Sequence, residues 1–179
     1  MIFTHTKQVQ YSIKEFRTMK NILFIAFVCI FAISCQREYL YLNEIPNILG
    51  TNIGECIETY QASSNAIGEW YYCETYSFEE KDSISPRHNT LYTDDASWVR
   101  HDWTKLPIDS AYLKVCNVIF NYCGTAKTEM LSREMEKINA LGCGYYSFCV
   151  KPSFDDPRYI IFCMLDTTET RLYVVDAHL

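Results

Sequence analysis

The sequence lacks an apolar run long enough to cross a membrane as a helix. Its longest run, residues 22–33, has twelve consecutive apolar residues, whereas a helix that crosses about 30 Å of hydrocarbon needs roughly twenty. The run follows Lys20 and ends in small residues, which is typical of the apolar part of a secretory leader. The sequence therefore predicts a leader that is removed, not a membrane-spanning helix.

Several motifs that mark known chemistry are also absent. The chain has no glycine-rich phosphate loop, no GxSxG elbow and no HExxH pair, which removes the enzyme classes that those motifs identify. It has no CxxC and no set of four Cys or His residues at the paired spacing of a zinc site. It also lacks a Lys/Arg-rich run of the kind that binds phosphate backbones. We therefore expect no metal, no cofactor and no nucleic-acid partner.

The end of the apolar run resembles the lipobox of bacterial lipoprotein signal peptides. The resemblance implies that residues 19–34 are the signal peptide, and that residues 1–18, which are polar and unpatterned, are an extension upstream of the true start. An ordinary cleaved signal peptide and an uncleaved anchor or buried helix are the alternatives. The residues that carry the resemblance are Ala32, Ile33, Ser34 and Cys35.

The resemblance also implies that cleavage after Ser34 leaves Cys35 as a lipid-modified N-terminus. We expect residues 35–43 to form a tether, and residues 44–179 to form a single globular domain, because the 145 residues left after cleavage suit one core. The lipid would hold the protein to the bacterial cell envelope, on the outer membrane, with the domain facing the periplasm or the outside.

The charge of the mature part is strongly negative. Four of the sixteen basic residues and one of the twenty-two acidic residues precede Cys35, so the remainder carries a net charge of −9. This acidity favours solubility, or a face that meets a basic protein partner.

Hydrophobic periodicity predicts a mixture of helices and strands. Apolar residues at helical spacing predict one or two short helices over 46–61 and a longer helix over 124–142 that is capped by Gly142. Strand patterns cover 69–80, 111–123, 144–153, 157–166 and 171–177, with a loop over 81–90 and short strands or irregular structure over 91–110.

The order of these elements predicts an α+β fold. Short connections join the last three strands, so they should form an antiparallel meander, with the continuously apolar 157–166 near its centre. We expect a two-layer sandwich in which two or three helices cover one face of a mostly antiparallel sheet.

Seven cysteines remain after Cys29 and Cys35, and an odd number cannot pair completely within one chain. The spacing selects no disulfide. If 111–123 is a strand, Cys116 and Cys123 cannot be partners, because seven extended residues span more than about 20 Å. Most of the seven lie in apolar runs, where cysteine acts as a small buried hydrophobe.

Two stretches offer candidate chemistry. In DDASWVRHDW, at 94–103, His101 stands beside Asp102, but neighbours on an extended segment face opposite sides, so we interpret this stretch as a solvated loop. Cys143, where the predicted helix passes into a strand, is a candidate nucleophile with His101 or His178 as its base. The alternative for Cys143 is a turn that only needs a small residue.

The sequence favours binding over catalysis. Thirteen of the fourteen tyrosines follow Cys35, and tyrosine offers a large contact area at low entropic cost. We expect a small lipid-anchored envelope protein that binds another protein, for example an immunity-type lipoprotein that neutralises a toxin at the membrane. The alternatives are a Cys- or His-dependent envelope hydrolase and a structural subunit of an envelope assembly.

Overall fold

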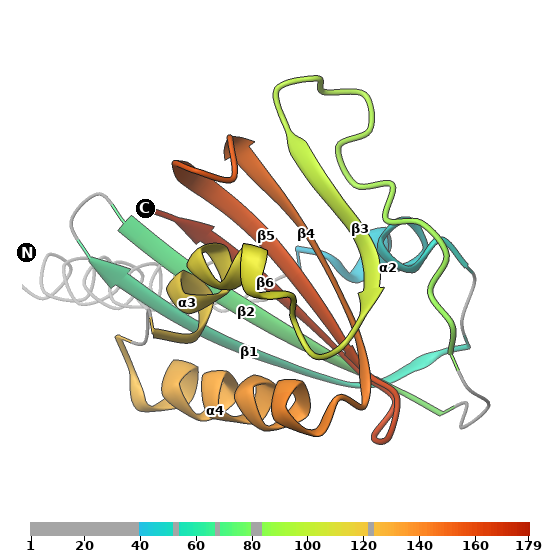
Figure 1. The fold of residues 1–179 in the computed structure, drawn as a ribbon. Helices are drawn as coiled ribbons and strands as arrows, with labels where there is room; N and C mark the ends of the chain where they lie inside the picture. The colour runs from blue at the N-terminus through green and yellow to red at the C-terminus, as the bar shows by residue number, and fades with distance from the viewer. Residues whose placement is uncertain (1–39, 52–53, 67–68, 80–83, 122–123) are drawn as a thin grey trace, which may run out of the picture. The chain divides into compact units, whose positions relative to one another are not determined.

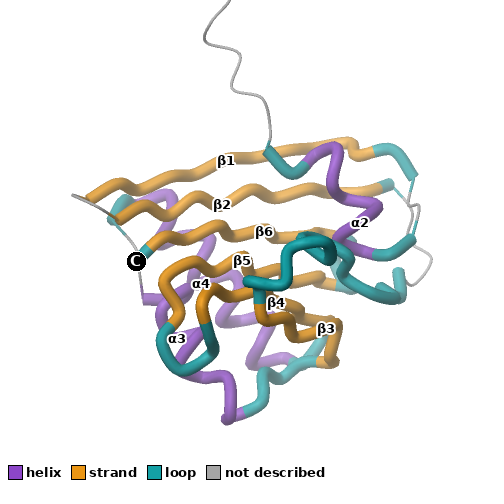
Figure 2. The backbone as a smooth tube through the Cα atoms, turned by 90° about the horizontal axis from the view of Figure 1, so that it is seen from above, coloured by secondary structure: helices purple, strands orange, loops and turns teal. Residues whose placement is uncertain are grey.

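The computed structural model describes residues 40–51, 54–66, 69–79, 84–121 and 124–179. The predicted leader, with Ser34 and Cys35, lies outside the described residues. The described part contains one six-stranded antiparallel sheet in the order β1-β2-β6-β5-β4-β3 (Figures 1 and 2). Its strands are β1 (Cys56–Ala66), β2 (Glu69–Phe78), β3 (Val99–Lys105), β4 (Gly144–Pro152), β5 (Pro157–Asp166) and β6 (Arg171–His178).

The predicted meander is confirmed as β4, β5 and β6. The connection from β5 to β6 is a tight turn in which Asp166 accepts a 2.7 Å hydrogen bond from the backbone N–H of Thr168. Strand β5 lies inside the sheet, and its residues 160–166 are all buried. Both of its faces are covered, which explains why its apolar run is continuous.

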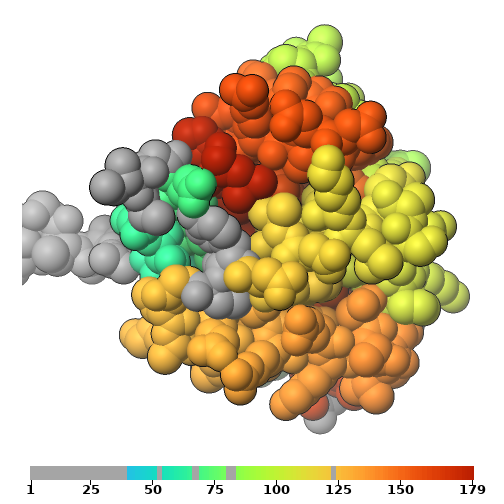
Figure 3. Space-filling view, turned by 60° about the vertical axis from the view of Figure 1, so that its left-hand side comes forward, coloured from blue at the N-terminus to red at the C-terminus, as the bar shows by residue number. Residues whose placement is uncertain are grey.

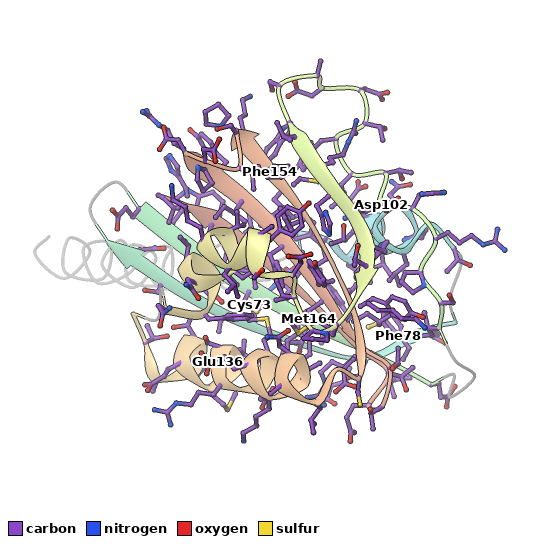
Figure 4. The ribbon with its side chains drawn as sticks, viewed as in Figure 1. Cys73, Phe78, Asp102, Glu136, Phe154 and Met164 are labelled. Atoms are coloured by element: carbon purple, nitrogen blue, oxygen red, sulfur yellow. The ribbon has the colours of Figure 1, made fainter. Side chains whose placement is uncertain are left out.

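Two separate cores lie on the two faces of the sheet. Helices α3 (Leu113–Asn121) and α4 (Ala126–Leu141) pack on one face, where Cys73 and Met164 join their core (Figure 4). The short helix α2 (Ile45–Leu49) follows the 3-10 turn η1 (Leu42–Glu44). It packs with part of segment 84–98 over the opposite face, where Phe78 is buried. The fold is therefore α+β, as predicted, with its two longer helices on one face.

Helix α4 is confirmed with both of its ends. Thr125 and Thr128 form a capping box at its start, and Gly142 adopts the left-handed conformation, with φ of 68°, after its last residue. No helix within the described residues is long and apolar enough to pass through a membrane.

The prediction of a strand over 111–123 is wrong. The chain forms the 3-10 turn η2 (Ser110–Tyr112) and then α3, which buries Val115, Cys116 and Ile119. These three positions also lie on one side of a helix, so an apolar pattern on both strand parities had two solutions. Asp109 caps the 3-10 turn that leads into α3, because its side chain accepts a hydrogen bond from the backbone N–H of Ala111 at 2.8 Å.

The predicted helix over 46–61 is correct only as far as Leu49. Gly50 ends it in the left-handed conformation, and a Cβ at Gly50 would lie 2.5 Å from the carbonyl oxygen of His88. From Cys56 onward the chain is β1, although several of its side chains are polar. Strand β1 forms because it pairs with β2 along its whole length, which its own sequence does not reveal.

Candidate binding surface beside a buried and a half-buried carboxylate

Glu74, on β2, carries a carboxylate that is completely buried. A buried carboxylate is tolerated only when hydrogen bonds replace its hydration. Glu74 has such bonds, and two of them come from the backbone of residues 40 and 41, so it fastens the start of the described chain to the sheet. The donors are the N–H groups of Leu40 (2.8 Å) and Tyr41 (3.0 Å), the amide of Gln61 (3.1 Å), and the hydroxyls of Tyr72 (2.6 Å) and Tyr76.

A second carboxylate, that of Asp176 on β6, lies beside Glu74. The hydroxyl of Tyr41 donates a 2.7 Å hydrogen bond to its Oδ2 atom. Burial raises the pKa of Asp176 to about 6, the negative charge of Glu74 adds to the rise, and the Tyr41 hydrogen bond and His178 oppose it. The pKa of the Tyr41 hydroxyl is also raised, mainly by burial. The protein thus keeps Asp176 ionised at neutral pH against a desolvation cost, which is common at functional sites.

Asp176 also lines an open groove of about 880 Å³ between residues 40–47 and residues 90–95. The groove is lined by four carboxylates, from Glu44, Asp94, Asp95 and Asp176, and by no Lys, Arg or His. Its other lining residues are Leu40, Tyr41, Asn47, Thr90, Leu91, Tyr92 and Thr93. The groove therefore presents negative charge with tyrosine rings at its sides.

The rim of the groove is held in place by ring stacking. Tyr92 stacks on Trp98 with ring centres 4.8 Å apart, and the ammonium group of Lys151 lies 5.9 Å from the centre of the Trp98 ring. The same ammonium group lies 3.9 Å from the carboxylate of Asp95. Hydrogen bonds from the side chain and backbone of Ser97 lower the pKa of Asp95, so this carboxylate stays charged. The 90–98 segment thus offers a fixed, negative edge.

An aromatic row continues from the groove along the sheet. Trp70, His178 and Tyr159 are neighbours on β2, β6 and β5, with Trp70 edge-on to His178 at 6.2 Å and Tyr159 stacked on it at 4.3 Å. They lie on the same face as Asp176, where α2 leaves the sheet partly uncovered, and Tyr159 is 40% exposed. Figure 3 shows this end of the sheet, with the dark red end of β6 between β1–β2 (green) and the orange β4–β5 region.

The structure separates His101 from Asp102, as expected for neighbours on a strand. Asp102 instead pairs with His88, whose Nδ1 atom lies 2.5 Å from Oδ2 (Asp102 is labelled in Figure 4). Burial alone would raise the pKa of Asp102, but hydrogen bonds from His88 and from the backbone of Asn89 and Trp103 lower it. The His88 side chain is 80% exposed, so the pair fixes the 84–90 segment to β3 and lies open to solvent.

His101 is half-buried and packs against the core beneath the helices. Its ring lies 4.3 Å from that of Tyr112, 4.9 Å from Phe148 and 5.2 Å from Tyr146. Its Nε2 atom is buried and has no hydrogen-bond partner among the described residues. Burial lowers the pKa of His101, which favours a neutral ring that packs as an aromatic side chain.

Trp103 shows where the solvated-loop interpretation of 94–103 is wrong. Its indole N–H donates a 2.7 Å hydrogen bond to the carbonyl oxygen of Ile48, and its ring packs against the core under α2. The second half of the stretch is strand β3.

The structure does not bring Cys143 to either candidate histidine. Gly144 pairs with Asp166 and His178 pairs with Tyr159, so seven residues of β5, about 23 Å, separate the two ends. His101 pairs with Phe148, five residues along β4 from Cys143, or about 16 Å. Cys143 is exposed, and its thiol donates only to the carbonyl oxygen of Leu141.

Cys56, Cys116, Cys149 and Cys163 are free thiols. Cys73, Cys116, Cys149 and Cys163 are buried, which confirms their role as small hydrophobes, and burial raises the pKa of Cys116 to about 12 and that of Cys149 to about 11. Cys123 lies outside the described residues. Within the described part of the chain, no three His, Cys, Asp or Glu side chains are grouped so that they could hold a metal ion.

The sequence does not mark Tyr41, Glu74 and Asp176 as a group. Tyr41 fell in the range expected for the tether, and the other two are carboxylates on the apolar parity of predicted strands. A carboxylate at a strand position where the pattern calls for an apolar residue was their only signal.

Comparisons with known proteins give no relative from which a function could be transferred. No protein-family model matches the chain, and no match was found among curated proteins or solved structures. The chemistry of the surface itself is therefore the basis for a function.

Proposed function

We propose that this protein is a lipid-anchored protein of the bacterial cell envelope that binds a protein partner through the groove and the aromatic row. The observation that carries the proposal is the continuity between the two. Asp176, at the groove, and His178, in the row, are two residues apart on the same face of β6.

The residue types on this surface are those that dominate protein interfaces. Tryptophan and tyrosine contribute large contact areas with few rotatable bonds, and they are enriched among the residues that carry most binding energy. Trp70 and Tyr159 are positioned by their neighbours in the row, so little conformational entropy is lost when they are covered. The rigid row supports a preformed docking surface.

The charge of the groove indicates the kind of partner. Four carboxylates line the groove and Lys151 balances only the charge of Asp95 among them, so the remaining negative charge favours a partner that presents lysine or arginine. Opposite charge speeds association and selects among partners. An immunity-type role, in which the protein occupies a basic surface of a toxin at the membrane, is the concrete form that we propose. The separation of Cys143 from His101 and His178 counts against a Cys–His hydrolase.

The test is affinity capture from envelope extract in mild detergent, with variants on opposite faces of the domain. Wild-type protein should retain a stoichiometric partner, and Trp70→Ala and Tyr159→Ala should each weaken its binding about tenfold or more. Met130→Ala is the matched control, because Met130 is an exposed apolar residue on α4, behind the sheet. A partner that binds all variants equally, or no partner at all, would overturn the proposal.

A further inference from the structure

Strand β1 forms an open edge of the sheet. Its eleven residues pair with β2 along one side, and within the described residues no strand lies along the other side (Figure 1). An edge strand of this length presents a row of backbone N–H and C=O groups that another strand can pair with. The edge is thus a template for one more strand.

The two edges of the sheet differ in how they are protected. The opposite edge strand, β3, has seven residues, a register shift between His101 and Thr104, and the charged residues Arg100, Asp102 and Lys105. Short length, irregularity and charge are the features that prevent unwanted strand pairing. Strand β1 has no lysine, arginine or proline, and Glu58 is its only charged residue. The register shift of β1 lies at its start, between Cys56 and Glu58, so residues 58–66 form a regular edge with less protection than β3 has.

We propose that β1 pairs antiparallel with β1 of a second copy of this chain, so that the two sheets become one. An overlap of the regular residues 58–64 is centred on Gln61, and it places Tyr60 opposite Ala62 and Glu58 opposite Ser64 of the other copy. No like charges then stand opposite each other, which an arbitrary strand would not ensure. The two-fold symmetry uses the same patch on both copies.

The charges beside β1 complement this pairing. Glu58 lies on the face of β1 that packs toward α4, since Ala62 on the same face belongs to the core under the helices. Ser64, on that face, touches the backbone just before α4, because a Cβ on Gly124 would collide with its hydroxyl. Lys127, in the first turn of α4, holds its ammonium group 6.0 Å from the centre of the Tyr60 ring.

In the paired arrangement, Glu58 of one copy lies opposite Ser64 of the other and therefore beside the start of the other copy's α4. We expect its carboxylate to approach Lys127, in the first turn of that α4, and the symmetry makes this contact twice. The acidic groove is not part of this interface, so the pairing is independent of the proposed function.

Sedimentation equilibrium of the full chain in a density-matched detergent tests the proposal. We expect a dimer for the wild type. Glu58→Lys and Lys127→Glu should each raise the dimer dissociation constant about tenfold, because each places like charges together at two symmetric contacts. The double variant Glu58→Lys/Lys127→Glu restores opposite charges and should restore the wild-type constant.

Thermal unfolding of the same variants separates pairing from folding, because both side chains are on the surface and the midpoints should stay close to that of the wild type. A chain that stays monomeric at micromolar concentration would overturn the proposal. The proposal would also be wrong if neither single variant weakened the dimer, or if the double variant stayed monomeric. It would equally be wrong if β1 paired with an extended segment of a different protein.

Discussion

The hydroxyl of Tyr41 is hydrogen-bonded to Asp176, 135 residues later in the chain, while the backbone N–H of Tyr41 is hydrogen-bonded to Glu74. One residue near the start of the domain is thus held by two carboxylates on the neighbouring strands β2 and β6. The first two predictions concern these carboxylates.

Asp176→Asn should stabilise the protein at neutral pH. The pKa of Asp176 is about 6 in the folded state and 3.8 when unperturbed, so the folded state binds more protons than the unfolded state between these values. The Asp176 contribution to stability is therefore present at low pH and lost as pH rises through about 6. Asparagine cannot ionise, so the variant should gain about 1–2 kcal/mol at pH 8 and almost nothing at pH 4.

Urea denaturation of wild type and variant at the two pH values measures this difference. A gain that is the same at pH 4 and pH 8 would show that ionisation of Asp176 has no part in it.

Glu74→Gln should destabilise the domain by about 2–4 kcal/mol. The two carboxylate oxygens accept five hydrogen bonds in a buried site, and in glutamine an NH2 group, which cannot accept them, replaces one of these oxygens. The loss should be most direct at residues 40 and 41, which donate to Glu74. Hydrogen exchange should therefore speed up at the Leu40 and Tyr41 amides. Exchange at the N–H of Gly142, which is bonded to Ile138 and Asn139 far from this site, is the internal control.

Gly50→Ala should cost more than Gly142→Ala. Both glycines have φ above 60°, where an alanine costs about 1–2 kcal/mol. At Gly50 the new Cβ would also lie 2.5 Å from a backbone oxygen, whereas at Gly142 its nearest neighbour would be 3.6 Å away. Thermal unfolding should rank the two variants in this order, and equal losses would contradict the close packing of α2 on His88.

The proposed lipid anchor predicts a specific mass. Protein purified from its native cell should begin at Cys35 and carry acyl chains, and the Cys35→Ser variant should carry none, because serine has no thiol to form the thioether. Intact-mass spectrometry distinguishes these products. A bare thiol at Cys35, or a leader retained in the wild type, would contradict the lipobox interpretation.

Local sequence patterns predicted the elements that carry their own periodicity, turn or cap signals. Strands β2, β4, β5 and β6 and helix α4 carry clear periodicity, turns or caps, and all five form where the sequence places them. Helix α3 was missed because its β-branched apolar residues fit two periodicities, and the only local helix signal was Asp109, which caps the 3-10 turn η2 just before it. Strand β1 was missed because polar edge strands depend on the neighbour that they pair with.

Local sequence patterns could not predict the candidate surface, for a different reason. Tyr41, Glu74 and Asp176 come from three distant segments, and only the β2–β6 pairing makes the two carboxylates neighbours. The sequence does show tyrosine enrichment and acidity, which are properties of the surface as a whole. It does not show that His88 is the partner of Asp102, because fourteen residues separate them.

Glu74 accepts a hydrogen bond from the backbone N–H of Leu40, five residues after Cys35. Fully stretched, five residues reach no further than about 18 Å. A lipid on Cys35 would therefore keep Leu40 within this distance of the membrane surface. Residues 40–47, and the groove that they border, would then lie close to the lipid headgroups.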